Sequence, residues 1–291
     1  MNKVLVTGCA GFIGHWLVRA LKKKGYFVIG IDNLSDGLVE YTKDCDVFHQ
    51  KDILELTPED FAGVKYVFHL AALPKINVSW EKPIETNRVN VEGTIKVLEC
   101  ARIAGVEKLV YSSSSSVYGA QPHYLLGEEM TPHPVSPYAV QKLAAEHYCE
   151  TYRRAGMVKT VSLRYFNVFG EEQKADNPYT GVLTRFMDFK KKGEYLTIYG
   201  DGNQTRDFTY VGDVVDANIR GAESKAEGVF NIGTGTRYSV KEVAAMISDR
   251  VLYLPPRPAE VLHTLAHIDR AKLFLGWKPT VNIKNWIKDN G

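Results

Sequence analysis

The chain has 291 residues, of which 45% are hydrophobic and 24% are charged, and its formal net charge at pH 7 is +2. This size and composition are typical of a soluble globular protein with one large or two closely joined domains. Such a small charge does not indicate nucleic acid or a membrane as the partner, and no apolar run approaches the roughly 18 residues of a membrane span. No secretory signal is visible, so we expect a cytoplasmic protein.

The four cysteines, Cys9, Cys45, Cys100 and Cys149, are spread along the chain. Their spacing matches neither a CxxC redox motif nor the ligand pattern of a metal site. We therefore expect reduced thiols in the core and no bound metal.

The chain begins with a glycine-rich motif between two regular patterns. Residues 3–7 have the apolar pattern of a buried strand, and an amphipathic helical pattern runs to Lys24. Between them stand Gly8, Gly11 and Gly14, in the context of a dinucleotide-binding strand–turn–helix unit. Glycines let a pyrophosphate approach the helix N-terminus, although a tight turn without any ligand also uses glycine.

Two aspartates follow the next two strand patterns. Residues 27–31 predict a strand that ends in Asp32, about 20 residues past the glycines, where a carboxylate accepts hydrogen bonds from an adenosine ribose. It would repel a 2′-phosphate, so NAD is favoured over NADP. Asp52, after the strand pattern at 47–49, is placed to hold the adenine amine or to serve a turn.

Strand and helix patterns continue to alternate along the chain. Further strands are predicted at 64–70, 109–112 and 159–164, and helices at 84–104, 137–154, 182–192 and 211–222. This alternation is typical of an α/β fold with a parallel, doubly wound sheet. The composition becomes more polar after Gly170. We therefore expect a first domain over 1–165 and a smaller lobe over 166–291, partly interleaved with it.

Tyr138 and Lys142 are the candidate catalytic pair. Pro137 is suited to the first helical position, which puts Tyr138 in the first turn, and residues four apart share a helix face. A phenol with a pKa near 10 must drop roughly three units to act as a base at neutral pH, which costs about 4 kcal/mol. An ammonium group about 4 Å away supplies about 4 kcal/mol at an effective dielectric constant of about 20. The spacing alone is no more frequent than chance.

The motifs together resemble the extended short-chain dehydrogenase/reductase family, and within it the NAD-dependent nucleotide-sugar epimerases of the UDP-glucose/UDP-galactose 4-epimerase type. The matching segments are VTGCAGFIG (6–14), IDNLSDG (31–37), HLAA (69–72), NVEGT (90–94), SSSSSVYG (112–119), SPYAVQK (136–142), LRYFNVFG (163–170), GDGNQTRDFTYVGDVV (200–215), FNIGTG (230–235) and LGWKP (275–279). The resemblance implies a Rossmann-type sheet, NAD as the cofactor and a C-terminal lobe that binds a nucleotide sugar.

The resemblance also implies roles for individual residues. Tyr138 is the base, Lys142 holds the ribose and lowers the pKa of the tyrosine, and Ser114 bonds the sugar hydroxyl, with Ser113 as the fallback register. Asn167, Arg206 and Arg257 are implied at the diphosphate. The residues implied at the cofactor are Gly8, Gly11, Phe12, Ile13, Gly14, Asp32, Asn33, Asp52, Ile53, Leu70, Ala71, Ala72, Asn90, Tyr138, Lys142 and Tyr165.

The implied reaction is epimerisation at C4 of a nucleotide-diphosphate sugar, most simply UDP-glucose/UDP-galactose, through a 4-keto intermediate. Related 4,6-dehydratases carry an acidic pair, and decarboxylases a glutamate, where this chain has Ser115 and Ser116. Without a general acid there, elimination is disfavoured. A dehydratase, decarboxylase or reductase of the same fold remains the alternative, and an NAD(H)-responsive binding module is the non-enzyme alternative.

Two further expectations concern the substrate pocket and the assembly. Some 4-epimerases carry a bulky aromatic residue where this chain has Thr264, so the hypothesis is that the pocket also accepts N-acetyl sugars. The family forms homodimers through the two helices expected near 84–104 and 137–154. Their patterns permit a homodimer here.

Overall fold

The structure is a computed structural model that describes residues 1–175, 181–256 and 261–290. Its central feature is a seven-stranded sheet in the order β12-β7-β5-β4-β1-β2-β3, and every pairing in it is parallel. The strands are β1 (Lys3–Thr7), β2 (Phe27–Asp32), β3 (Val47–Gln50), β4 (Val64–His69), β5 (Lys108–Ser114), β7 (Lys159–Tyr165) and β12 (Gly228–Ile232). The predicted doubly wound α/β fold is confirmed.

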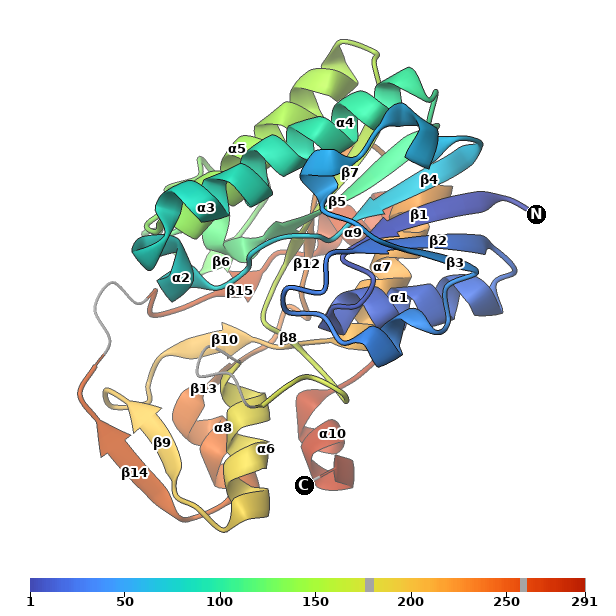
Figure 1. Cartoon of the computed structure of the whole chain (residues 1–291). Helices are drawn as coiled ribbons and strands as arrows, with labels where there is room; N and C mark the ends of the chain where they lie inside the picture. The colour runs from blue at the N-terminus through green and yellow to red at the C-terminus, as the bar shows by residue number, and fades with distance from the viewer. Residues whose placement is uncertain (176–180, 257–260, 291) are drawn as a thin grey trace.

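Helices cover both faces of this sheet (Figure 1). On one face lie α1 (Phe12–Lys23) and α7 (Val211–Glu223), and on the other lie α4 (Gly93–Ile103) and α5 (Pro137–Arg154). Successive strand residues point to opposite faces, so Val4 and Val6 of β1 enter the first core whereas Leu5 enters the second. Burial on both faces explains why these strands are continuous apolar runs.

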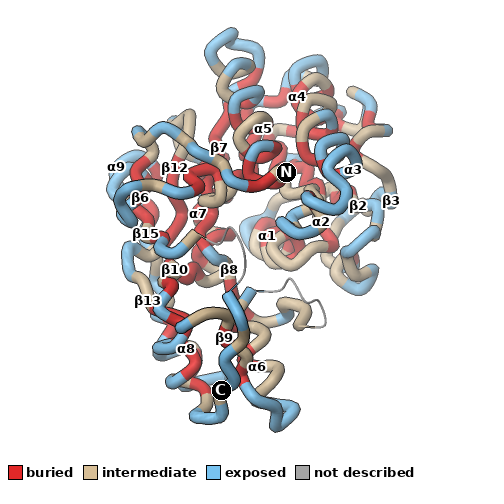
Figure 2. The backbone as a smooth tube through the Cα atoms, turned by 90° about the vertical axis from the view of Figure 1, so that its left-hand side faces the viewer, coloured by how far each residue is buried: buried red, intermediate tan, exposed pale blue. Residues whose placement is uncertain are grey.

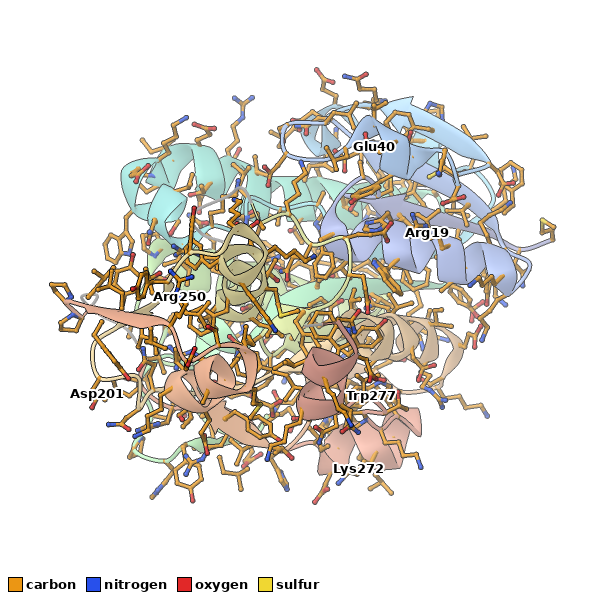
Figure 3. All side chains as sticks on the ribbon, turned by 90° about the horizontal axis from the view of Figure 1, so that it is seen from below. Arg19, Glu40, Asp201, Arg250, Lys272 and Trp277 are labelled. Carbon is orange, nitrogen blue, oxygen red and sulfur yellow. The ribbon has the colours of Figure 1, made fainter. Side chains whose placement is uncertain are left out.

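The C-terminal part of the chain returns to this sheet. The edge strand β12 pairs with β7, and α7 packs beside α1. Near α9 (Asp269–Leu275), the buried Trp277 (Figure 3) donates from Nε1 to the main-chain oxygen of Asp213 at 2.9 Å. Residues beyond 166 therefore complete the dinucleotide-binding half.

The helix expected over 84–104 is interrupted. The structure has α2 (Ile76–Glu81), α3 (Pro83–Asn87), a π-helical turn over Arg88–Glu92 and then α4. The π turn lies where the Asn90 side chain turns inward, and its oxygen accepts from the Leu73 N–H at 2.8 Å. Such turns insert one residue without changing the apolar periodicity much, so the pattern predicted a single helix.

The remaining elements form a smaller lobe below the sheet in Figure 1. Its helices are α6 (Val182–Lys192), α8 (Val240–Ile247) and α10 (Ile283–Asn290), and its longer strands are β9 (Leu196–Tyr199) and β14 (Val251–Leu254), which pair in parallel. Phe186, Ile198, Val243 and Ile287 belong to its separate core. Figure 2 shows these buried stretches inside an exposed outer surface.

Short strand pairs join the lobe to the sheet. They are β10 (Thr205–Asp207) with β13 (Arg237–Ser239), β11 (Thr209–Tyr210) with β8 (Val168–Phe169), and β15 (Leu265–Ala266) with β6 (Leu125–Leu126). In the part of the chain that the structure describes, no helix combines the length and the apolar character that a membrane crossing requires.

Candidate active site

A cavity of about 720 Å³ opens at the carboxyl ends of the central strands. This is the edge at which open parallel sheets bind ligands. Most residues predicted to bind the dinucleotide line it, namely Gly8, Gly11, Phe12, Ile13, Gly14, Asp32, Asn33, Asp52, Ile53, Leu70, Ala71, Ala72, Tyr138, Lys142 and Tyr165. The structure therefore brings these residues together.

The glycine-rich turn leaves no room for side chains at two of its positions. A Cβ atom on Gly14 would stand 2.0 Å from the main-chain oxygen of Gly8, and Gly8 itself has a φ of +73°. Gly11 is the N-cap of α1 and offers no side-chain acceptor to the first N–H groups, and the first turn has no acidic residue. The turn thus leaves the helix N-terminus suited to an anion such as a pyrophosphate.

Two carboxylates line the cavity, Asp32 at the end of β2 and Asp52 shortly after β3. Asp32 accepts from the main-chain N–H groups of Ala10 at 3.0 Å and Leu34 at 2.8 Å, and burial is the main cause that raises its pKa. Asp52 accepts from Leu54 N–H and from the Asn33 amide, each at 2.9 Å. Each carboxylate oxygen keeps a further lone pair for a ligand, which fits the roles predicted at ribose and adenine.

Tyr138 and Lys142, the candidate catalytic pair, lie at the start of α5, as predicted. Ser136 caps this helix by accepting from Ala139 N–H at 3.2 Å, and Pro137 occupies its first turn. Lys142 Nζ donates to the Ser112 oxygen at 2.8 Å and lies 5.0 Å from the Tyr111 ring centroid. Tyr138 and Lys142 are only 9% and 4% exposed.

The sequence predicted that Lys142 lowers the pKa of Tyr138. In the protein without a bound cofactor, the pKa of Tyr138 is raised instead. Burial raises the pKa of Tyr138 to about 12, against the smaller lowering effect of a hydrogen bond from Ser114. Burial also lowers the pKa of Lys142 to about 8. Because Lys142 directs its ammonium to Ser112 and loses hydration itself, it does not offset the burial of the phenol.

The serine run has a defined register in the structure. Ser113 Oγ donates to the buried Glu146 carboxylate at 2.7 Å, and the same carboxylate pairs with Arg164. Ser114 Oγ accepts from Ser116 N–H and Oγ at 3.2 and 2.9 Å, and Ser114 lowers the pKa of Tyr138. Ser112 and Ser113 line the cavity wall, whereas the predicted Ser114 is not among its lining residues.

Asn90 does not line the cavity, in contrast to its predicted role at the cofactor. It is 2% exposed, and its amide donates to the Leu73 oxygen at 3.1 Å and to Gln141 at 2.9 Å. Leu73 does line the cavity. Asn90 therefore supports the cavity wall without lining it, because its side chain bonds to both main-chain groups of Leu73 and holds the segment after β4 in place.

The loop over 171–174 forms part of the cavity wall that the sequence did not predict. Glu172, Gln173 and Lys174 line the cavity. Glu172 accepts from His15 Nε2 at 3.0 Å and from Arg19 at 2.7 Å, both on α1. No sequence signal marked this loop, because its partners stand about 150 positions earlier in the chain.

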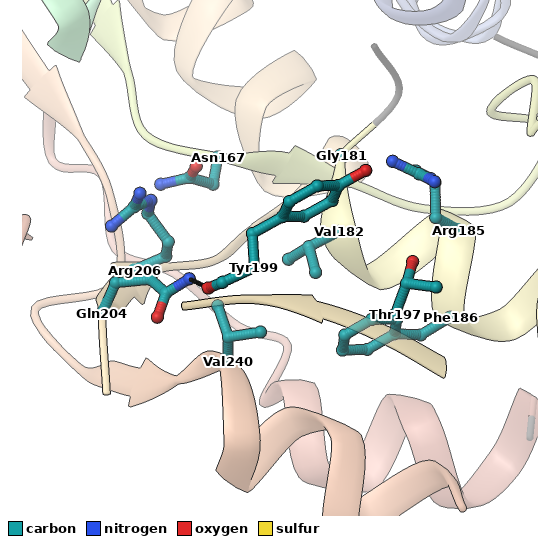
Figure 4. A pocket seen from close by; sticks show the side chains of 10 residues that line it. All are labelled: Asn167, Gly181, Val182, Arg185, Phe186, Thr197, Tyr199, Gln204, Arg206 and Val240. Atoms are coloured by element: carbon teal, nitrogen blue, oxygen red, sulfur yellow. Dashed lines mark hydrogen bonds between the residues drawn. The ribbon is translucent and has the colours of Figure 1, made fainter. Parts of the chain in front are cut away.

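A second pocket of about 190 Å³ lies in the smaller lobe (Figure 4). The predicted ligands Asn167 and Arg206 both line it, together with Gly181, Val182, Arg185, Phe186, Thr197, Tyr199, Gln204 and Val240. Gly181, the N-cap of α6, lines both pockets. Apolar side chains, two arginines and amide groups together suit a nucleotide base with its phosphates.

Of the two remaining predicted substrate contacts, Arg257 and Thr264, the structure describes only Thr264. Arg257 lies outside the described residues. Thr264 is only 9% exposed. Its main-chain N–H donates to the Thr205 oxygen at 3.2 Å, and this bond places Thr264 beside β10, the strand that contains Arg206. Its Oγ1 atom is buried, with no hydrogen-bond partner in the described part of the protein.

The fold and the cavity define a dinucleotide-dependent enzyme of the extended short-chain dehydrogenase/reductase class. The model of the NAD dependent epimerase/dehydratase family matches residues 4–233, and the chain belongs to this family. It therefore groups with nucleotide-sugar epimerases, as the resemblance implied, and its cofactor is NAD.

Three proteins illustrate the similarity. UDP-glucose 4-epimerase of Mycolicibacterium smegmatis is 35% identical over 301 residues, covering 98% of this chain and 96% of that protein. A UDP-N-acetyl-alpha-D-glucosaminuronate decarboxylase of Bacillus cytotoxicus is 34% identical over 275 residues, covering 87% and 84%. The structure of UDP-N-acetylglucosamine 4-epimerase from Methanobrevibacter ruminantium M1, in complex with UDP-N-acetylmuramic acid, has a TM-score of 0.94 at 34% identity and covers 99% and 96%.

Proposed function

We propose that this protein interconverts the two C4 epimers of a UDP-sugar through a transient 4-keto sugar. The observation on which this rests most is the position of Tyr138 and Lys142 in the cavity wall, with Ser114 close enough to Tyr138 to lower the pKa of the phenol. The nucleotide would lie in the pocket with Asn167 and Arg206, and the sugar would point from there toward Tyr138.

The residues around the large cavity fit NAD. When bound, NAD accepts a hydride from the sugar carbon and returns it, and its oxidised ring brings a positive charge. The turn from Gly8 to Gly14 would hold the pyrophosphate, and Asp32 the adenosine ribose.

Within the protein, Tyr138 would exchange a proton with the sugar 4-OH, directly or through Ser114. A phenol with a pKa of about 12 needs a shift of roughly five units, or about 7 kcal/mol, to work at neutral pH. One nearby cation supplies about 4 kcal/mol. The positive charge of oxidised NAD would therefore have to act together with a Lys142 ammonium that no longer turns to Ser112, which ties the basicity of Tyr138 to the bound cofactor.

The alternatives within the family require an acid that this site lacks at the expected place. Ser115 and Ser116 open a short 3₁₀ helix, and Ser116 is engaged with Ser114. The nearby Glu146 is buried and neutralised by Arg164. These contacts favour epimerisation. Dehydration and decarboxylation would each be assisted by a carboxylic acid at this position, where the chain has serines.

For the sugar, we infer that UDP-glucose and UDP-galactose are substrates and that the N-acetyl forms are accepted as well. The support is the resemblance, in which some 4-epimerases carry a bulky aromatic residue where this chain has Thr264, together with the similarity to a UDP-N-acetylglucosamine 4-epimerase. We also propose a homodimer. Exposed apolar side chains on α3, α4 and α5, namely Ile84, Ile103, Val140 and Tyr148, are available to bury against a second copy.

The proposal is tested with UDP-glucose deuterated at C4. A hydride that leaves and returns within one bound complex keeps its deuterium, so UDP-galactose should form with the label retained at C4. Loss of the label to the solvent would contradict the proposal. Binding of NAD and UDP-glucose without any product would favour a binding module instead.

A further inference from the structure

Two of the four cysteines meet beside the glycine-rich turn. Cys9 lies within this turn and is fully buried, whereas Cys45 precedes β3 and is partly exposed. Both sulfur atoms lie over Gly30 of β2. A Cβ atom built on Gly30 would stand 2.4 Å from Cys45 Sγ and 2.8 Å from Cys9 Sγ. The two sulfurs are therefore at most 5.2 Å apart, the sum of these distances.

The two thiols lie close enough to influence each other's ionisation. Their interaction is the main cause that raises the pKa of Cys9 and lowers the pKa of Cys45. Cys45 is thus the more acidic and the less buried thiol, although burial and the charges of Asp44 and Asp46 oppose its ionisation and Lys22 favours it. A partly exposed, more acidic thiol next to a buried partner thiol is the arrangement of an attacking and a resolving cysteine.

We propose that Cys9 and Cys45 form a reversible intramolecular disulfide when the protein meets a hydroperoxide, and that this cross-link weakens NAD binding. The Cys45 thiolate attacks the peroxide, the O–O bond breaks, and Cys45 becomes a sulfenic acid while the alkoxide leaves with a proton as the alcohol. Cys9 sulfur then attacks Cys45 sulfur, and water leaves with the Cys9 proton. Two thiols are oxidised and one peroxide bond is reduced.

The effect on NAD follows from the position of Cys9. A disulfide requires the sulfurs to close to about 2.05 Å, so one of the two segments must move. The main chain of Cys9 has little freedom, since its Cα lies 2.9 Å from the point where a Cβ on Gly14 would stand. Any shift of Cys9 therefore disturbs Gly8 and Gly14, which shape the pyrophosphate site.

Cys100 and Cys149 provide internal controls. Both are buried in the core on the opposite face of the sheet from Cys9 and Cys45. Burial raises the pKa of each thiol. Neither should react at peroxide concentrations that oxidise the pair.

The test treats the intact protein with hydrogen peroxide, blocks free thiols with N-ethylmaleimide and analyses tryptic peptides by mass spectrometry. We expect peptide Val4–Arg19 linked to Asp44–Lys51 with the loss of two hydrogen atoms, and release of both by dithiothreitol. Cys100→Ser should form the same link. Full alkylation of both cysteines in the oxidant-treated, folded protein would overturn the proposal.

Calorimetry then measures NAD binding before and after oxidation. The dissociation constant of the wild type should rise about fivefold or more and recover with dithiothreitol. Cys45→Ser should show no such rise, and an equal rise in this variant would overturn the link to the disulfide. If neither form binds NAD, the cofactor assignment of the proposed function fails, while the peptide result still decides whether the disulfide forms.

Discussion

At the scale of single residues, the chemistry rests on how burial changes a side chain. Tyr138 is buried so deeply that its pKa rises to about 12, and only positive charge brought near it makes it a base. The sequence predicted the identity of Tyr138 and Lys142 from their spacing and motif. It did not predict the direction of the pKa, because a spacing says nothing about how much water is removed from each group.

Replacing the phenol tests its role directly. Tyr138→Phe should lower kcat by roughly two to four orders of magnitude, the usual contribution of a general base. Thermal stability and NAD binding should change little. Tyr152→Phe is the matched control, because Tyr152 is on the same helix and bonds to Glu99 on α4, away from the cavity. Near wild-type kcat in Tyr138→Phe would exclude the tyrosine as the base.

His69 should give the fold a pH dependence. It is fully buried between the Thr7 and Thr94 hydroxyls, at 2.7 and 3.0 Å, and burial lowers its pKa to about 3. The unfolded chain takes up this proton below about pH 6.5 but the folded chain does not, so stability falls as the pH drops from about 6.5 toward 3. Between pH 6.5 and 5, the unfolding free energy should fall by about 2 kcal/mol more than in His69→Gln.

This difference is measured by urea denaturation at several pH values. His69→Gln has a lower stability at neutral pH, since its hydrogen bonds change, and therefore only the slopes are compared. Parallel slopes for the two proteins would mean that His69 is protonated in the native state.

At the scale of elements, the sequence predicted the long helices and most strands but not the loop that lines the cavity. The sequence predicted most of the central strands and, to within a residue or two, the helices α1, α5, α6 and α7, because their apolar periods are long and regular. It missed the edge strand β12, the π-helical turn before α4 and the 171–174 loop. These depend on partners far away in the chain, which a local pattern does not contain.

The 171–174 loop should slow the release of NAD. Glu172 adopts a φ of +64°, a conformation that costs a non-glycine residue roughly 1–3 kcal/mol and persists where its contacts hold it. Those contacts are with His15 and Arg19. Glu172→Gln should therefore speed NAD dissociation roughly tenfold, as expected from the loss of a charge-assisted hydrogen bond.

Stopped-flow displacement of NAD measures this rate. Glu223→Gln is the matched control, since Glu223 pairs with Lys24 just past the other end of α1 and does not line the cavity. An unchanged rate in Glu172→Gln, or an equal increase in both variants, would show that the loop does not retain the cofactor.

At the scale of the whole molecule, the proposed site draws residues from both halves of the chain. The glycine-rich turn, the serine run and the start of α5 come from the first half, whereas Asn167 and Arg206 come from the second. The motifs of the sequence predicted cofactor residues in the first part of the chain and substrate residues in the second. It left open the sugar, because specificity depends on the volume of the sugar pocket, and a single residue type such as Thr264 does not give a volume.

Assembly is the prediction that belongs to this scale. Val140 and Tyr148 are 51% and 40% exposed on one stripe of α5, and we expect them to be buried in a homodimer. Val140→Asp combined with Tyr148→Asp should shift the sedimentation coefficient from a dimer to a monomer, because unpaired charge is costly in an apolar interface. A wild type that sediments as a 32.7 kDa monomer at micromolar concentration would contradict this.

The most direct test of the account is proton NMR of the purified protein, supplied with NAD and incubated separately with UDP-glucose, UDP-N-acetylglucosamine and UDP-glucuronate. We predict that the galacto epimer appears from UDP-glucose and from its N-acetyl form, with no accumulation of NADH. Turnover of UDP-glucose alone would contradict only the role of Thr264. No epimer from any of the three, in a protein that binds NAD, would contradict the assignment as a UDP-sugar 4-epimerase.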